Sequence, residues 1–519
     1  MSLWDHIEVC YNLTLELFAY LRKGAVTWIY MLARLILFTF ILTPAWINLL
    51  WYWFFSRHVV RNISYSSFAS HNRNLLDIYL PDTENRDREV DTNNSNKKQR
   101  RKVIIFFSGG AWVIGYKLWV ATCAYVYTQL GYIVVAPDYR NFPQGDIEDM
   151  VVDSHAAVEW TIANIDSFGG DSDRVILAGQ SAGAQISLCM LVQEYSKSKA
   201  NIKKVKKSGK KVDDDVGVSN TINILNHISM YVGISGPYNL ESLSNHLNRR
   251  GLSSSLLEGI FRNDLAIYSP TAMLAELVHG SWSFIDTPHS TPARRPTLEK
   301  ESSERTWRES DSPMSPKANQ KATTTTKLSD NKRRSTELVD FPPVLLYHGM
   351  KDHTIPYRQC SELGDVLRAG GARVRVVLVP DWSHTDSILE SPLSGDASMA
   401  SDIDRYYSLL LNETAAQTSS VKGSWLPTNS VVDVLFRKPS ASTSSRDNNT
   451  DCTTSTPVKS QKQVTSTYSS VSSSTTTETS AVVSRDAFSG SVTGIPPARV
   501  RHSFTEKWVV QLAKPFNPF

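Results

Sequence analysis

Ser181 is the first residue whose type and setting could perform chemistry. It is the centre of Gly-Gln-Ser-Ala-Gly at residues 179–183, a pattern that is weak by itself because it also arises by chance in long chains. Its setting is more specific, since a β-branched run at 175–178 precedes it and a helical pattern at 182–195 follows it. Strand, tight turn and helix present a serine hydroxyl as a nucleophile for acyl transfer.

A glycine-rich loop could supply the hydrogen-bond donors that such a serine needs. Residues 102–107 predict a strand, and Ser-Gly-Gly-Ala-Trp follows at 108–112. Glycines leave backbone N–H groups open to the oxyanion of a tetrahedral intermediate. We therefore assign the oxyanion hole to the N–H groups of Gly110, Ala111 and Ala182, with Gly109 shaping the loop. The first residue of this loop is Ser108. Glycine-rich oxyanion loops of the His-Gly-Gly type carry a histidine at this position, which we interpret as structural.

The acid and the base are expected to follow the serine in chain order. Residues 343–348 predict a strand, and Asp352 would lie just past its carboxyl end, at the edge of a parallel sheet where active sites form. His384 lies in a loop after the strand predicted at 374–379, from which its imidazole could reach both Ser181 and Asp352. The three residues predict a Ser-His-Asp triad.

Other polar residues near these strands favour simpler roles. The chain has 12 histidines. Of these, His348 at a strand end and His353 beside the acid are expected to pack or to face solvent. Asp138 and Arg140 follow the strand predicted at 132–136, and we expect them to form a structural clamp between loops rather than a substrate contact.

Elements that could position these residues alternate along the chain, and Asp146 could cap one of the helices. Strands are expected at 75–80, 102–107, 132–136, 175–178, 228–232, 344–347 and 374–379, and helices at 119–130, 147–165, 182–195, 358–369 and 403–411. Near-continuous apolar strands separated by helices predict a mostly parallel, twisted sheet with helices on both faces. With the Gly-x-Ser-x-Gly turn, this arrangement is the α/β-hydrolase fold.

Four stretches do not follow this alternation, because they are charged or rich in Ser, Thr, Lys and Asn. They have too few apolar residues to offset the entropy lost on ordering. We therefore expect a catalytic domain at 65–411, with a disordered Ser/Thr-rich tail at 412–519. The disordered insertions within the domain are expected at about 83–101, 196–220 and 281–337.

The residues before the catalytic domain predict a membrane anchor within the region 1–64. Residues 35–55 are almost wholly apolar, and their length at about 1.5 Å per residue matches the thickness of a bilayer core. Trp51, Tyr52 and Trp53 cluster at one end, as in an interfacial aromatic belt. We expect a transmembrane helix at 35–55, with membrane lipid as a partner.

Composition argues against several other classes. The 55 basic and 51 acidic residues give a formal net charge of +4. This near balance predicts no nucleic-acid partner, and the lysine-rich run at 203–211 is interpreted as a solvated loop. The five cysteines are scattered without a C-x-x-C pair and so indicate neither a zinc site nor a disulfide framework. Triad chemistry requires no metal and no organic cofactor.

Longer motifs resemble those of the isoprenylcysteine α-carbonyl methylesterases, in the hormone-sensitive-lipase-like branch of the α/β-hydrolases. The motifs are Gly-Gly-Ala-Trp-Val-Ile-Gly-Tyr-Lys (109–117), Asp-Tyr-Arg-Asn-Phe-Pro-Gln-Gly (138–145), Gly-Gln-Ser-Ala-Gly-Ala (179–184), Gly-Pro-Tyr-Asn-Leu (236–240), His-Gly-Met-Lys-Asp (348–352) and Ser-His-Thr-Asp (383–386). The resemblance implies substrate-contacting positions at Gly109, Gly110, Ala111, Gln180 and Ala182.

The resemblance also implies a substrate and a compartment. The substrate would be a prenylated, carboxyl-methylated protein or a prenylcysteine methyl ester, hydrolysed with release of methanol at endoplasmic reticulum or Golgi membranes. A lipidic substrate suits an anchored enzyme, because a prenyl chain partitions into a bilayer at about 0.8 kcal/mol per buried CH₂.

Two alternatives to this reading remain open. A general carboxylesterase, lipase or arylformamidase shares the glycine-rich loop and the Gly-x-Ser-x-Gly turn. An inactive, esterase-like adhesion or scaffold protein is disfavoured because such proteins usually lack part of the triad, whereas all three members are present here.

Overall fold

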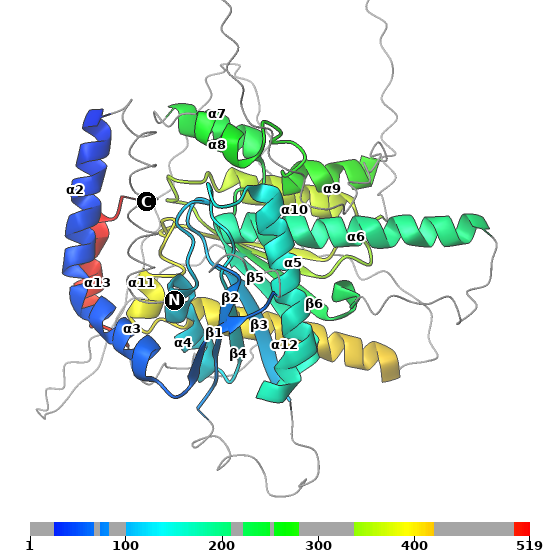
Figure 1. Ribbon diagram of the computed structural model, residues 1–519, viewed down its shortest axis with the longest axis horizontal. Helices are drawn as coiled ribbons and strands as arrows, with labels where there is room; N and C mark the ends of the chain where they lie inside the picture. The colour runs from blue at the N-terminus through cyan, green and yellow to red at the C-terminus, as the bar shows by residue number, and fades with distance from the viewer. Residues whose placement is uncertain are drawn as a thin grey trace, which may run out of the picture. The chain divides into compact units, whose positions relative to one another are not determined.

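Eight strands form one sheet in the order β1-β2-β4-β3-β5-β6-β7-β8 (Figure 1). The computed structural model describes residues 25–66, 73–82, 100–208, 222–249, 254–279, 337–419 and 503–518. The strands are β1 (Val59–Ser64), β2 (Leu75–Tyr79), β3 (Arg101–Phe107), β4 (Ile133–Pro137), β5 (Gly170–Gln180), β6 (Ile228–Ile234), β7 (Val344–Gly349) and β8 (Val374–Val379). β3 to β8 are parallel, whereas β2 is antiparallel to both β1 and β4. This mostly parallel sheet confirms the predicted architecture.

Both faces of the sheet are buried, because its central strands are apolar at nearly every position. In β3, Val103, Ile105 and Phe107 belong to the hydrophobic core on one face. The residues between them, Ile104 and Phe106, belong to the core on the other face. The alternation follows from the two-residue period of a strand.

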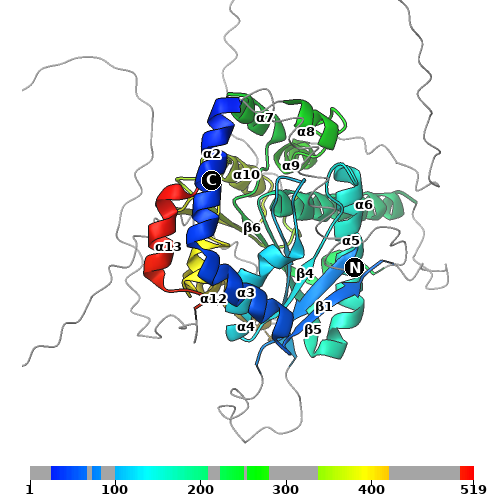
Figure 2. The same ribbon diagram turned by 60° about the vertical axis from the view of Figure 1, so that its left-hand side comes forward.

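Helices cover the two faces (Figures 1 and 2). On one face, the core includes residues of α5 (Ile147–Asn164), α6 (Ala182–Ser208), α9 (Pro270–His279) and α10 (Arg358–Ala369). On the other face, it includes residues of α3 (Thr43–Phe55), α4 (Ala121–Gln129), α12 (Ser398–Ser419) and α13 (Lys507–Ala513). The other helices are α2 (Ala25–Ile41), α7 (Leu240–Arg249), α8 (Ser254–Ile260) and α11 (Glu390–Leu393), with 3₁₀ turns η2 (Lys117–Val120), η3 (Ile165–Phe168), η4 (Ile224–Asn226) and η5 (Lys514–Phe516).

The predicted N-cap of α5 is confirmed. A carboxylate oxygen of Asp146 accepts hydrogen bonds from the N–H groups of Glu148 at 3.0 Å and Asp149 at 3.2 Å. The Asp149 carboxylate in turn accepts from the N–H of Asp146 at 3.2 Å, which completes a capping box. The bounds of β8 and α10 also match their predictions.

The ordered domain begins before the predicted boundary at residue 65. β1 pairs with β2 along the edge of the sheet, so its residues belong to the catalytic domain rather than to the predicted anchor region 1–64. Only Val59 of this strand is buried. Arg61, Asn62 and Ser64 are polar, and these residues obscured the pattern of the strand in the sequence.

The predicted insertion at 196–220 is helical in its first part, because α6 continues to Ser208. Its lysines and alanine are good helix formers, and Lys199 forms an ion pair with Asp340 at 3.0 Å. The rest of this insertion lies outside the described residues. So do the predicted insertion at 281–337, except for its last residue, and residues 83–99 of the first insertion.

The predicted tail at 412–519 is also partly ordered. α12 runs on to Ser419, and residues 503–518 form α13 and η5. Phe504, Val509, Val510 and Ala513 are buried, so this short segment packs through apolar residues. Residues 420–502 lie outside the described part of the chain.

Two helices replace the single transmembrane helix predicted at 35–55. The pair Leu32–Ile41 and Thr43–Phe55 is bent by 66°, and no one helix in the described residues is long and apolar enough to cross a bilayer alone. Proline lies within the first two positions of α3, where its missing N–H is tolerated at a helix start but breaks a continuous helix.

One side of this helix pair packs against the domain. Phe38, Leu42, Ala45, Leu49 and Trp53 are buried, and their spacing of three or four residues marks one helical face. α13 lies beside α2 on the same side of the molecule in both ribbon views (Figures 1 and 2). The helix pair is thus partly a component of the core.

Candidate functional site

Ser181 lies at the sharp turn between β5 and α6, with φ of 52°. A side chain in this left-handed region is strained, and strain of this kind is common where a fold forces a reactive group into position. The turn is held on both sides: the Ser181 N–H donates to Ile234 O at 2.9 Å, and its carbonyl accepts from Ala184 N at 3.0 Å. The predicted turn is therefore present.

Two glycines let the strand and the helix meet at this turn. A Cβ on Gly179 would lie 2.5 Å from Gly183 O, and a Cβ on Gly183 would lie 2.3 Å from Phe107 O and 2.4 Å from Ser108 O. These neighbours are backbone atoms, which cannot rotate away. The Gly-x-Ser-x-Gly spacing is thus explained by the close approach of β5, α6 and the end of β3.

The structure brings the three predicted residues together. His384 Nε2 lies 2.9 Å from Ser181 Oγ, and His384 Nδ1 lies 2.7 Å from Asp352 Oδ2. All three residues are buried. One imidazole therefore links a hydroxyl to a carboxylate, which is the arrangement that lets histidine accept the serine proton.

Asp352 is held as a carboxylate. Its Oδ1 accepts from Thr354 N at 2.9 Å and Ile355 N at 2.8 Å. Burial acts to raise the pKa of the Asp352 carboxyl, but the imidazoles of His384 and His348 outweigh burial and hold this pKa well below its usual range. The carboxylate is therefore charged at neutral pH and can stabilise an imidazolium.

His348 is a site residue that the sequence did not reveal. Its Nε2 lies 3.1 Å from Asp352 Oδ2 and 2.9 Å from Ile355 O, so it touches the carboxylate that also contacts His384. We expected it to pack or to face solvent, and the structure shows that its side chain is buried. Its position four residues before Asp352, at a strand end, was the available signal.

The glycine-rich loop lies against Ser181. A Cβ on Gly109 would come within 2.8 Å of Ser181 Cβ, and φ is positive at Gly110, Ala111 and Trp112. Among the described residues, no backbone carbonyl of a turn or loop accepts from the N–H groups of Gly110, Ala111 or Ala182. The predicted oxyanion hole needs donors at these positions.

Buried polar contacts fix the shape of this loop. Tyr139 OH donates to Ser108 O at 2.9 Å, and Asn141 Nδ2 donates to Gly115 O at 2.9 Å. Trp112 Nε1 donates to Gln185 Oε1 on α6 at 2.8 Å. The loop is therefore held at both ends and in the middle by side chains of the motif at 138–145 and of α6.

Gln180 lies beneath the site. Its side chain is buried, and its Nε2 lies 3.3 Å from His384 O. Its Oε1 would be 2.2 Å from a Cβ on Gly109. Gln180 thus lies between the loop that carries His384 and the glycine-rich loop.

Asp138 and Arg140 both clamp neighbouring segments, as predicted, but each does so through partners of its own. Arg140 pairs with Asp149 and Asp153 of α5, each at 2.8 Å. Asp138 accepts from Lys117 N at 2.7 Å; burial raises the pKa of its carboxyl to about 6. Arg140 therefore holds α5, whereas Asp138 holds the end of the motif at 109–117.

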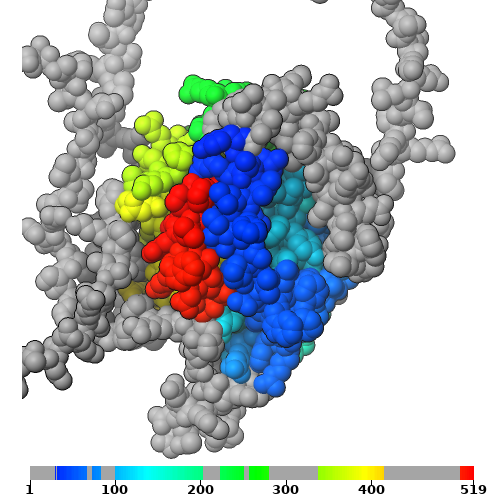
Figure 3. Space-filling model, turned by 90° about the vertical axis from the view of Figure 1, so that its left-hand side faces the viewer, coloured from blue at the N-terminus to red at the C-terminus, as the bar shows by residue number. Residues whose placement is uncertain are grey.

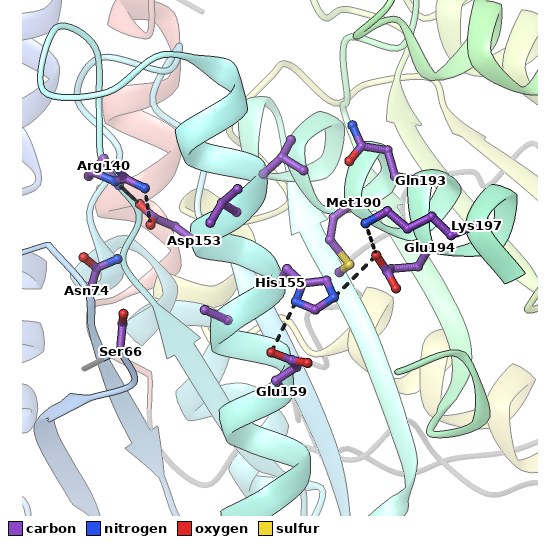
Figure 4. Close-up of a pocket in the computed structure, with 13 residues that line it drawn as sticks. Ser66, Asn74, Arg140, Asp153, His155, Glu159, Met190, Gln193, Glu194 and Lys197 are labelled. Carbon is purple, nitrogen blue, oxygen red and sulfur yellow. Dashed lines mark hydrogen bonds and ion pairs between the residues drawn. The ribbon is translucent and has the colours of Figure 1, made fainter. Parts of the chain in front are cut away.

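A separate hollow of about 420 Å³ lies between α5 and α6 (Figure 4). His155 points into it between Glu159 and Glu194, at 3.4 Å from each carboxylate. None of its lining residues belongs to the Ser181 site. Among the described residues, no group of three or more His, Cys, Asp or Glu side chains could hold a metal ion.

Comparisons with known proteins indicate the family of this chain. The BD-FAE family model matches residues 76–272. A probable isoprenylcysteine alpha-carbonyl methylesterase of Oryza sativa subsp. japonica is 31% identical over 386 residues, which are 74% of this chain and 70% of that protein. The isoprenylcysteine alpha-carbonyl methylesterase of Arabidopsis thaliana is 30% identical over 386 residues, with the same coverage. The chain belongs to the isoprenylcysteine α-carbonyl methylesterase family. As a member of this family it is a carboxylic-ester hydrolase.

Two solved esterase structures are similar to this member of the isoprenylcysteine α-carbonyl methylesterase family. Esterase B from Lactobacillus rhamnosis has a TM-score of 0.44 and 14% identity, with 75% of this chain and 98% of that chain covered. Esterase 2 from Thermogutta terrifontis has a TM-score of 0.39 and 16% identity, with 71% and 97% covered.

Proposed function

We propose that Ser181 is the nucleophile, His384 the general base and Asp352 the orienting acid of an esterase. Its substrate would be the carboxyl methyl ester of a C-terminal S-prenylated cysteine. The observation that carries the proposal is the pair of contacts made by His384, 2.9 Å to Ser181 and 2.7 Å to Asp352. The names of the relatives supply the substrate class.

The first step forms an acyl-enzyme. Ser181 Oγ attacks the ester carbonyl while His384 Nε2 takes its proton, and Asp352 stabilises the resulting imidazolium. The N–H groups of Gly110, Ala111 and Ala182 donate to the oxyanion. The intermediate collapses when His384 returns the proton to the methoxy oxygen, so that methanol leaves and Ser181 carries the acyl group.

The second step restores the serine. His384 removes a proton from water as the water oxygen attacks the acyl carbonyl. Collapse of the second tetrahedral intermediate returns that proton to Ser181 Oγ and releases the free prenylcysteine carboxylic acid. One ester and one water become one acid and one methanol, with no change in oxidation state.

The proposal includes attachment to a membrane, at the endoplasmic reticulum or Golgi, as the resemblance implies. Support comes from large apolar side chains that are exposed on α2, α3 and α13, which lie side by side in Figure 3. They include Ile36, Phe40, Ile47, Trp51, Phe54, Phe55, Trp508 and Leu512. Exposed apolar side chains on neighbouring helices suit contact with lipid, in which a prenyl chain would reside.

The test compares two substrates on membranes that contain either wild type or Ser181→Ala. We expect wild type to hydrolyse farnesylcysteine methyl ester with a higher kcat/KM than soluble p-nitrophenyl acetate. We expect Ser181→Ala to lower turnover of both by at least about 10³-fold, because the nucleophile is lost. Equal preference for the soluble ester would point to a general carboxylesterase.

A fluorophosphonate probe separates an enzyme from an inactive esterase-like protein. The probe reacts only with an activated serine, so wild type should be labelled and Ser181→Ala should not. Normal hydrolysis by Ser181→Ala, or its normal labelling, would refute the assignment of the nucleophile.

A further inference from the structure

The segment 503–518 contacts the loop that carries His384. Lys514 Nζ lies 2.5 Å from Asp386 Oδ1. Asn517 Nδ2 donates to Thr385 Oγ1 at 2.8 Å and to Glu390 Oε1 at 2.5 Å. These contacts join two parts of the chain about 130 residues apart, on the first and second residues after the proposed base.

The loop is folded tightly around His384. Asp386 Oδ2 accepts from both the N–H and the Oγ of Ser383, each at 2.8 Å. This carboxylate therefore closes a turn over the histidine, while its other oxygen meets Lys514. Asp386 is buried, with 3% of its surface exposed, so a charge partner matters more here than at the surface.

Asn517 contacts the residues on both sides of His384. Besides Thr385, its amide nitrogen lies 3.4 Å from Ser383 Oγ. Thr385 Oγ1 also donates to Glu390 Oε1 at 3.0 Å. One amide thus connects the residues before and after His384 to the start of α11.

The segment is itself fixed to the N-terminal helices. Arg34 Nη2 on α2 donates to Pro515 O at 2.9 Å and to Asn517 O at 2.8 Å. Asn48 Nδ2 on α3 donates to Phe504 O at 2.8 Å. Since Phe504 is buried as well, the segment can hold a loop in place instead of following its motion.

The base needs such support because it lies between elements. No helix or strand is present between Val379, where β8 ends, and Glu390, where α11 begins, yet the imidazole must stay within hydrogen-bond distance of both Ser181 and Asp352. A displacement of about 1 Å can cost about 100-fold in rate. A loop held only by its own turn would allow displacements of this size.

We infer that Lys514 and Asn517 are positioning residues for His384. Neither touches Ser181 or Asp352; each acts through the residues that flank the histidine. The inference rests on the proposed role of His384 as the base. It gives the segment 503–518 a part in ester hydrolysis that its distance in the sequence from the triad conceals.

The test uses the full chain with Lys514→Ala, Asn517→Ala and the double variant. We expect the double variant to lower kcat, and the rate of fluorophosphonate labelling, by about tenfold to about 100-fold, with KM within about twofold of wild type. Lys514→Arg keeps the ion pair with Asp386 and should restore most of the lost rate. Lys507→Ala, an exposed lysine on α13, is the matched control and should behave as wild type.

The thermal midpoint distinguishes positioning from folding. We expect Lys514→Ala and Asn517→Ala to unfold within a few degrees of wild type, because their contacts lie at the edge of the core. A wild-type labelling rate in the double variant would overturn the inference while leaving the esterase proposal intact. So would a loss that Lys514→Arg fails to restore. Slowed labelling in the variants, alongside poor turnover of the farnesylated ester by wild type, would support the inference and contradict the proposed substrate.

Discussion

The backbone at Ser181 is left-handed, and neighbouring residues stabilise this conformation. The left-handed φ of 52° is held by hydrogen bonds to Ile234 and Ala184. The glycines two residues away on each side remove the side chains that would separate β5 from α6 and β3. The motif visible in the sequence is therefore a packing requirement as much as a chemical one.

The first prediction concerns Gly183. In Gly183→Ala the new methyl group meets Phe107 O and Ser108 O at 2.3 and 2.4 Å, and backbone atoms must move. We expect the free energy of unfolding to fall by about 2 kcal/mol or more, as in other overpacked cores. We also expect esterase activity to be lost. Thermal unfolding and fluorophosphonate labelling measure the two effects.

Gly259→Ala is the matched control for Gly183→Ala. Gly259 lies in α8, where the nearest atom to a new Cβ is 3.2 Å away on the Phe142 ring. The Phe142 ring must move by a few tenths of an ångström, and the preference of a helix for alanine over glycine, about 1 kcal/mol, offsets this cost. We therefore expect the stability of Gly259→Ala to lie within about 1 kcal/mol of wild type. Equal stability of the two alanine variants would contradict the packing argument.

At the scale of elements, the sequence predicted the residues that lie directly after strands. Ser181, Asp352 and His384 each follow a buried apolar run, and parallel strands bring their carboxyl ends to one edge of the sheet. It could not predict the contact between His348 and Asp352, because that contact depends on the conformation of the turn between them. It also could not predict that Asn517 meets Glu390, since no local pattern links residues 127 apart.

Glu390, at the start of α11, predicts a pH-dependent stability. Burial, followed by the charge of Asp386, raises the pKa of its carboxyl from the ordinary value of 4.5 to about 7, against the lowering effect of Lys514. A raised folded-state pKa means that the folded protein binds the proton more tightly than the unfolded one. Protonated Glu390 therefore stabilises the folded protein fully below about pH 4.5, and this contribution is lost as the pH rises toward about 7.

Glu390→Gln should remove this dependence, because glutamine stays neutral and its amide oxygen can still accept from Asn517 and Thr385. We expect its thermal midpoint to match wild type at pH 5 and to exceed it by several degrees at pH 8. Glu241→Gln, at an exposed position on α7, is the control and should leave the difference between the two pH values unchanged. A Glu390→Gln midpoint that falls with pH as steeply as that of wild type would rule out this carboxyl as the cause.

At the scale of the whole molecule, apolar surface is distributed unevenly. The central sheet is covered on both faces, as the sequence predicted, but α2, α3 and α13 leave large side chains exposed on one side (Figure 3). The predicted single span was wrong in form, because the helix breaks before Thr43 and its buried stripe belongs to the core. Composition alone could not distinguish a helix surrounded by lipid from one that packs on one side only.

Membrane contact through this side can be tested with lipid vesicles. Phe40 and Phe55 are 73% and 68% exposed, and burying one such side chain in an apolar phase contributes about 1.5–3 kcal/mol. We expect Phe40→Ser and Phe55→Ser each to lower the partition coefficient onto phosphatidylcholine vesicles by about tenfold or more. Leu409→Ser, on α12 and 54% exposed, should bind as wild type does. Equal losses in all three variants would argue against a specific contact surface.

The contact between Arg34 and Pro515 has a consequence for synthesis, because it spans 481 residues. At about 5–20 residues per second, roughly 25 to 100 s separate the translation of α2 from that of its partner α13. Toward the end of this interval the nascent chain contains Ser181, Asp352 and His384, but the segment that steadies the base does not yet exist. The apolar side of α2 that α13 later covers is open to chaperones or to a bilayer for the same time. The support that we infer for His384 therefore becomes available only after the last segment of the chain has been translated.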